Sequence, residues 1–142
     1  MRILGIDHGN RRIGVAVSDP LGISASPLII LEHIARNVDA QRVVRLAEEH
    51  DCSLILIGLP LDSDGSVGAR ARSVNRFIDE VRRQTSLQVV AWDESNSTLM
   101  TIQASIDRGE KRIKRSQPMD DQAAAIILQD YLDTLSLGSS GA

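Results

Sequence analysis

The hydrophobic positions of this chain fall first into short apolar runs. Two of them, residues 1–7 and 13–18, are separated by polar residues that include Gly9 and Asn10, which predicts a β-hairpin. A third run, residues 23–32, contains Pro27, and this favours an edge or interrupted strand because proline donates no ladder hydrogen bond. Residues 53–60 are apolar without alternation, which is typical of a central parallel strand, and residues 87–92 predict a fifth strand.

Apolar residues then recur at helical spacing in four segments, which predict helices over residues 37–50, 67–84, 96–108 and 119–135. The order of these elements predicts an α/β fold, in which a five-stranded mixed sheet is flanked by helices on both faces. We expect one domain over residues 1–137 and a disordered tail over residues 138–142, which are glycine, serine and alanine.

Composition narrows the function classes. The net charge is −3, so any contact with nucleic acid must come from a local basic face, and three aromatic residues are few for a protein that reads bases by stacking. Cys52 is the one cysteine, which excludes an internal disulfide and a cysteine zinc site, and its apolar surroundings predict a buried structural thiol. Without a signal-like or membrane-length apolar stretch, we expect a cytoplasmic protein with no membrane partner.

Acidic residues stand at the ends of predicted elements. Asp7 ends the first strand, Asp93 and Glu94 end the fifth, and Asp120 opens the last helix on its apolar side. Structural roles would also explain two of these residues, since Asp7 would form the turn and Asp120 would stabilise the helix N-terminus. Spacing alone does not decide between these structural roles and a catalytic one. As a group, acids from three segments would suit Mg²⁺ or Mn²⁺, and two such ions about 3.5–4 Å apart would hydrolyse a phosphodiester.

Four motifs resemble the YqgF/RuvX family of RNase H-like nucleases, in the family's order and over nearly the whole chain. They are residues 5–19 (GIDHGNRRIGVAVSD), 57–68 (IGLPLDSDGSVG), 92–98 (WDESNST) and 119–132 (MDDQAAAIILQDYL). The resemblance implies an RNase H-like fold and a metal-dependent nuclease. Bacterial members are described as nucleases that mature the 5′ end of precursor 16S ribosomal RNA, which we favour, or as Holliday-junction resolvases.

Carried over to this sequence, the resemblance implies that Asp7, Glu94 and Asp120 are catalytic. The implied ligands of Mg²⁺ or Mn²⁺, with two ions expected, are Asp7, Asp93, Glu94 and Asp120, and the choice between Asp93 and Glu94 stays open. Ser95 stands where the family usually has an arginine, which puts substrate affinity or choice in question. His8 neighbours Asp7, and since successive residues of a strand point to opposite faces we interpret it as a bystander, with a role in proton transfer left open.

Basic residues near these acids would offset the charge of substrate phosphates. The candidate substrate-binding residues are Arg11, Arg12, Arg70, Lys111, Arg112, Lys114 and Arg115. A solvated basic loop over residues 108–118 would explain the last four equally well.

Two other function classes share parts of this pattern. Sugar kinases and actin-like ATPases open with a similar hairpin, but they build their cleft from two such domains and this chain predicts one. A module that binds nucleic acid without cutting it would explain the fold, but it has no use for acids that repel phosphate. The expected partner is structured nucleic acid, either precursor rRNA or branched DNA. A junction resolvase would need two active sites and hence a homodimer, whereas an rRNA-trimming enzyme could act as a monomer, so the oligomeric state stays open.

Overall fold

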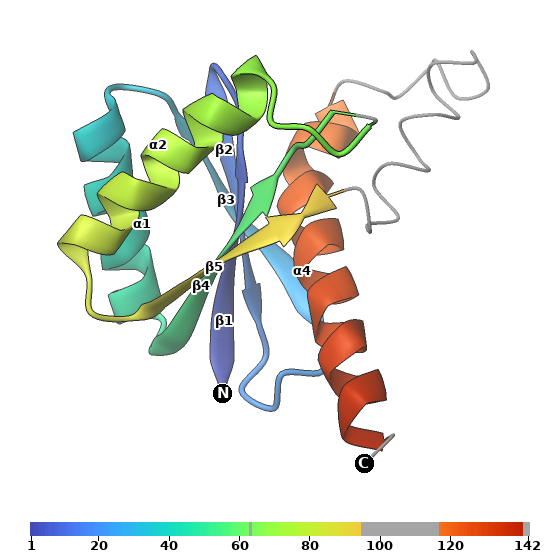
Figure 1. The fold of residues 1–142 in the computed structure, drawn as a ribbon. Helices are drawn as coiled ribbons and strands as arrows, with labels where there is room; N and C mark the ends of the chain where they lie inside the picture. Colours follow the sequence, from blue (N-terminus) through green and yellow to red (C-terminus); the bar gives the residue numbers. More distant parts are fainter. Residues whose placement is uncertain (63, 95–116, 141–142) are drawn as a thin grey trace.

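The computed structural model describes residues 1–62, 64–94 and 117–140, except the side chains of residues 117–121 and 137–140. Figure 1 shows one sheet with helices on both of its faces. The strands are β1 (Arg2–His8), β2 (Arg12–Ser18), β3 (Ala25–Glu32), β4 (Cys52–Leu59) and β5 (Gln88–Asp93). The helices are α1 (Arg36–Glu49), α2 (Ala69–Gln84) and α4 (Gln117–Ser140).

The five strands form one mixed sheet in the order β3-β2-β1-β4-β5. β1 pairs antiparallel with β2 and parallel with β4, and β5 pairs parallel with β4. The predicted hairpin is confirmed, and so is the edge position of β3, where the register shifts beside Pro27. The unbroken apolar run of β4 follows from its place between two parallel neighbours, where both faces of the strand are covered by helices.

α1 and α2 cover one face of the sheet, and α4 covers the other (Figure 1). On the first face Phe77 is the largest fully buried side chain. On the α4 face the helix approaches the sheet closely, because a Cβ atom on Gly5 would lie 2.9 Å from Cβ of Leu128. A glycine in β1 therefore sets how near α4 packs.

The directions of the elements bring several of their ends together. β1, β4 and β5 are parallel, so their carboxyl ends share one edge of the sheet, which we call the carboxyl edge. The amino-terminal ends of α1, α2 and α4 lie at the same edge, as Figure 1 shows. Side chains at these ends therefore meet at the carboxyl edge, where ligands of open α/β sheets usually bind.

The observed ends of two helices differ from the predicted ones. α2 begins at Ala69 rather than near residue 67, and α4 continues to Ser140, across residues expected in a disordered tail. An established helix gains one hydrogen bond for each residue added, which offsets the poor propensity of Gly138 and the serines. The predicted helix over residues 96–108 and the basic loop up to residue 116 lie outside the described residues, and the single domain over residues 1–137 stays a prediction. No helix in the described ranges has the length and apolar character to cross a membrane.

Candidate active site

Asp7 points toward α4 from the end of β1. Alternate residues of a strand share a face, and Ile3 and Gly5 pack against α4, so Asp7 lies on the same face as they do. Ile6 pairs with Ile57 of β4, which places Asp7 level with Gly58. The carboxylate thus stands at the carboxyl edge, beside the central strand.

Glu94 approaches Asp7 by crossing over β4. A Cβ atom on Gly58 would lie 2.6 Å from Oε1 of Glu94 and 3.0 Å from Cδ1 of Ile127 in α4. The Glu94 side chain therefore lies against the bare backbone of β4, between the sheet and α4. Any larger residue at position 58 would displace this carboxylate, so Gly58 is a structural requirement of the site.

The two acids interact electrostatically in a poorly solvated place. Glu94 is 8% exposed, and its pKa is raised from 4.5 to about 7, first by burial and then by the negative charges of Asp7 and Asp93. Arg70 opposes this rise. The site therefore carries more negative charge than its own basic residues offset, and oxygen ligands in that state suit a hard divalent cation.

The geometry separates Asp93 from Glu94. Val90 and Trp92 of β5 pack on the α4 face, where Trp92 contacts Tyr131 edge-on with ring centroids 5.1 Å apart. Alternation along β5 directs Asp93 to the other face and returns Glu94 to the face of Asp7. Between these two neighbours, the strand register therefore favours Glu94 as the partner of Asp7.

The third predicted acid is only partly described. Asp120 falls in the first turn of α4, which begins at the carboxyl edge, but its side chain is outside the described part of the structure. Wholly outside the described residues are Ser95, Lys111, Arg112, Lys114 and Arg115. Within the described ranges, no three His, Cys, Asp or Glu side chains converge as a metal-binding group. Two of the predicted ligands, Asp7 and Glu94, are thus brought together there.

Comparison with known proteins identifies the chain. The model of the RuvX family, described as Holliday junction resolvase, matches residues 1–134. This chain belongs to the RuvX family. It is 40% identical to a Desulforamulus reducens protein, with 94% of this chain and 98% of the relative covered, and 34% identical to a Clostridium botulinum protein, with 96% and 99% covered. Both relatives bear the name "Putative pre-16S rRNA nuclease".

Solved structures agree on the fold. The chain is similar to Thermus thermophilus RuvC in complex with Holliday junction substrate, with a TM-score of 0.59 and 14% identity over 95% of this chain and 96% of that one. It is also similar to the fowlpox virus Holliday junction resolvase, with a TM-score of 0.53 and 16% identity over 95% and 99%. The RuvX chain therefore has the RNase H-like fold that the sequence predicts.

His8 of this RuvX chain lies on the opposite face from Asp7. Its ring stacks on Phe77 of α2, with centroids 4.4 Å apart and an interplanar angle of 29°. Burial lowers the pKa of His8, although the nearby carboxylate of Asp39 acts in the other direction. The alternation argument is confirmed, and His8 does not face the acids.

Among the predicted basic residues that the structure describes, Arg70 acts electrostatically on Glu94. It belongs to the first turn of α2 at the carboxyl edge, and its charge acts on the pKa values of both Glu94 and His8. Arg11 and Arg12 are exposed at the β1–β2 turn of the same edge. The structure thus brings three of the seven predicted basic residues to the edge that carries Asp7 and Glu94.

Gly65 and Gly68, which precede α2, are required by the local conformation of the loop. Gly65 has φ +85° in a turn that the amide of Gly65 closes by donating to the carbonyl of Asp62 at 2.8 Å. A Cβ atom on Gly68, which precedes α2, would lie 2.6 Å from Oδ2 of Asp62. The Asp62 carboxylate thus lies where a phosphate would approach the start of α2.

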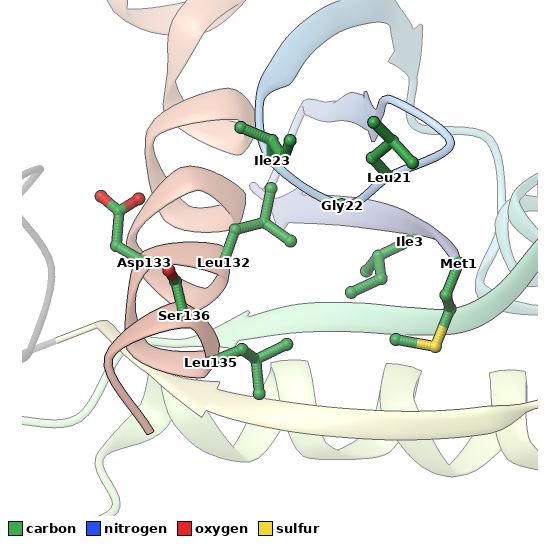
Figure 2. Close-up of a pocket in the computed structure, with 9 residues that line it drawn as sticks. All are labelled: Met1, Ile3, Leu21, Gly22, Ile23, Leu132, Asp133, Leu135 and Ser136. Carbon is green, nitrogen blue, oxygen red and sulfur yellow. The ribbon is translucent and has the colours of Figure 1, made fainter. Parts of the chain in front are cut away.

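One cavity of the described residues lies away from these acids. It measures about 390 Å³ and is lined mostly by apolar side chains, among them Met1, Ile3 and Leu132 (Figure 2). It opens beside the amino end of β1, whereas Asp7 stands at the carboxyl end of that strand. In this RuvX chain this apolar cavity is therefore separate from the candidate active site.

Proposed function

We propose that this protein is a metal-dependent nuclease that hydrolyses phosphodiester bonds and acts in maturation of the 5′ end of precursor 16S rRNA. The observation that carries the proposal is the meeting of Asp7 and Glu94 over Gly58, where burial and mutual repulsion raise the pKa of Glu94 to about 7. Groups with strongly perturbed pKa values cluster at functional sites. The names of the relatives at 34–40% identity support the choice of substrate.

In this proposal Asp7, Glu94 and Asp120 are the catalytic acids, and they hold two Mg²⁺ or Mn²⁺ ions at the carboxyl edge. Ions held by these residues would supply a hydroxide at neutral pH and would stabilise the leaving oxygen. Glu94 takes precedence over Asp93 as a ligand because it shares the face of Asp7. Fixed on β1 and against β4, the two carboxylates keep their positions before substrate arrives, which limits the cost of reorganisation.

The basic residues of the edge orient the substrate. Arg70 lies in the first turn of α2 at this edge and acts electrostatically on Glu94, and its guanidinium would offer a phosphate two parallel hydrogen bonds. Arg11 and Arg12 extend the positive surface across the β1–β2 turn, and the basic segment over residues 111–115 precedes α4, whose first turn carries Asp120. Such contacts neutralise backbone charge without reading sequence, so the substrate would be recognised by its structure. A role in rRNA processing places the protein in the cytoplasm.

The second candidate is resolution of branched DNA. The description of the RuvX family and the fold of RuvC with its junction substrate favour it. Symmetric cutting of a junction requires two active sites, so this function would need a homodimer. The third candidate, a non-catalytic binding module, is disfavoured by Glu94, because a buried acid beside a second acid is costly and would weaken the binding of phosphate.

Cleavage assays with Mg²⁺ or Mn²⁺ would test the proposal on a precursor 16S leader RNA and on a four-way DNA junction. We expect wild-type protein to cut the RNA, and Asp7→Asn and Glu94→Gln to lose at least about a hundredfold in rate, since each removes a ligand charge. The cleavage rate of Asp93→Asn should fall much less. Glu48→Gln, at an exposed position of α1, is the matched control.

Each alternative has its own outcome in these assays. Cutting of the junction alone, by a protein that is dimeric in solution, would move the function to recombination. Folded wild-type protein that binds both substrates and cuts neither, or an Asp7→Asn variant as active as wild type, would refute the nuclease assignment.

A further inference from the structure

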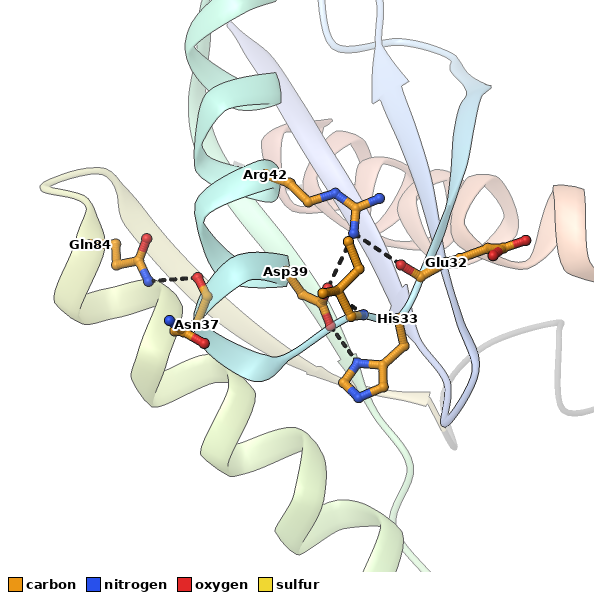
Figure 3. Close-up of polar contacts among 7 residues, drawn as sticks. Glu32, His33, Asn37, Asp39, Arg42 and Gln84 are labelled. Atoms are coloured by element: carbon orange, nitrogen blue, oxygen red, sulfur yellow. Dashed lines mark hydrogen bonds and ion pairs between the residues drawn. The ribbon is translucent and has the colours of Figure 1, made fainter.

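A second polar cluster lies on the face of the sheet away from Asp7 and Glu94, where β3 connects to α1 (Figure 3). Its centre is Asp39, which is 0% exposed. Oδ2 of Asp39 lies 2.5 Å from Nδ1 of His33, and Oδ1 accepts from the amide of Ile34 at 3.1 Å and from Nη1 of Arg42 at 3.2 Å. Arg42 also donates to the carbonyl of Glu32 at 2.9 Å. These bonds hold the His33 ring in one orientation.

This fixed ring lines a cavity of about 250 Å³ at the carboxyl edge. The other lining residues are His8, Gly9, Asn10, Arg36 and Ser73, so no carboxylate lines it. Arg36 is the first residue of α1, and the partial positive charge of that helix end adds to its guanidinium. Hydroxyl, imidazole, amide and guanidinium groups thus surround one small space, which is the chemistry that proteins use for phosphate.

We propose that this cavity, which we call the His33 cavity, binds a phosphate group. Arg36 supplies the charge, and Ser73 and His8 supply hydrogen bonds. His33 presents Nε2 because Nδ1 is engaged by Asp39.

The position of the cavity indicates where the phosphate comes from. Asp7 and His8 are consecutive, so the acids and the His33 cavity lie on two sides of one strand end. Arg70, in the first turn of α2 at the same edge, lowers the pKa values of both Glu94 and His8, so its charge acts on a group at each site. A nucleic-acid strand cut at the acids would therefore continue over the β1–β2 turn and place another backbone phosphate in the cavity. This source rests on the proposed function, whereas phosphate binding itself does not.

Histidine side-chain NMR offers a direct test, because the chain has three histidines. His8 and His33 line the cavity, and His50 follows the opposite end of α1 and serves as the internal reference. The ¹H–¹⁵N ring signals are followed at constant pH and ionic strength, in EDTA to prevent cleavage. The two probes are inorganic phosphate and a single-stranded RNA oligonucleotide without terminal phosphates. Arg36→Gln is the test variant, and Arg45→Gln, an exposed arginine of the same helix, is its control.

We expect the oligonucleotide to shift the His8 and His33 signals and to leave His50 unchanged. Arg36→Gln should weaken this binding about tenfold, as loss of one charge-assisted contact predicts, and Arg45→Gln should not. A response to inorganic phosphate but not to the oligonucleotide would support the phosphate site and overturn the strand as its source. No response to either probe, or equal losses in both arginine variants, would overturn the proposal.

The same experiments separate this proposal from the nuclease assignment. Protein that shows the histidine shifts but cuts no substrate with added metal would refute the nuclease and keep the cavity. Protein that cuts its substrate while His8 and His33 stay silent would refute the cavity alone.

Discussion

Replacing Glu94 by glutamine should stabilise the metal-free protein at neutral and alkaline pH. Glu94 has its pKa raised from 4.5 to about 7 in the folded state, so between these values the folded protein holds a proton that the unfolded chain has released. Stability falls with rising pH wherever the folded state binds more protons. The wild type therefore loses stability from about pH 4.5 to about pH 7, a loss that glutamine, which does not ionise, avoids.

The size of the effect follows from the same pKa values. A rise from 4.5 to about 7 corresponds to about 3 kcal/mol of unfolding free energy, since one pKa unit is worth about 1.4 kcal/mol. In a chain of 142 residues, 3 kcal/mol corresponds to roughly 10 °C in melting temperature. The gap between Glu94→Gln and wild type should thus be small near pH 4.5 and largest above pH 7.

Thermal and urea denaturation from pH 4.5 to 8.5 in EDTA would measure this gap. Glu48→Gln, on the exposed side of α1, is the control, and its gap should stay constant. Mg²⁺ added at pH 8 should then stabilise the wild type more than Glu94→Gln. A gap that does not change with pH, or a variant less stable than wild type at pH 8, would refute the burial and repulsion described for Glu94.

Three further predictions concern single contacts. Gly58→Ala places a Cβ atom 2.6 Å from Oε1 of Glu94, so nuclease activity should fall at least about tenfold while circular dichroism reports a folded protein. Gly5→Ala places Cβ 2.9 Å from Cβ of Leu128, and overpacking at this contact should lower the unfolding free energy by about 1–3 kcal/mol in urea. Asp39→Asn removes the charge that three donors share, and a loss of about 1–3 kcal/mol is expected in the same measurement.

Control variants accompany two of these predictions, and each of the three has an outcome that would contradict it. Ser53→Ala, at an exposed position of β4, should leave activity unchanged, and a Gly58→Ala variant equally active would contradict the clash. Asp79→Asn, exposed on α2, controls for Asp39→Asn, and equal stabilities of the two would show that the buried carboxylate contributes little. An unchanged urea midpoint in Gly5→Ala would mean that α4 moves away from the sheet at no cost.

The fold could be predicted because local and tertiary signals agree in this chain. Pro27 marks β3 as the edge since it lacks an amide hydrogen, and residues 54–57 mark β4 as central since they are apolar on both faces. The last helix was predicted to end at residue 135 because Gly138 and the serines have low helix propensity, but α4 continues to Ser140. Intrinsic propensity is a weak guide at such ends.

The sequence predicts which acidic residues lie at the ends of strands, but it does not predict how their side chains come together. The sequence left the choice between Asp93 and Glu94 as metal ligand open, and alternation along β5, with Trp92 on the α4 face, favours Glu94. Gly58 carried a signal, since a glycine within a strand often marks a close approach, but the approaching side chain is 36 positions away in the chain. The sequence gives no signal for the role of His33, because its bond to Asp39 spans a β–α connection and obeys no helical or strand period.

The shared direction of α1, α2 and α4 has a consequence for how the molecule meets its partner in solution. Each helix places about half a positive charge at the carboxyl edge, where Arg36 and Arg70 also lie, and α1 ends at the opposite side of the sheet with Glu48 and Glu49. The carboxyl edge thus sets positive helix ends and arginines beside the acidic pair Asp7 and Glu94, in a protein whose net charge is −3. A polyanion that approaches this edge meets these positive groups around the acids, so its association should slow as salt screens them.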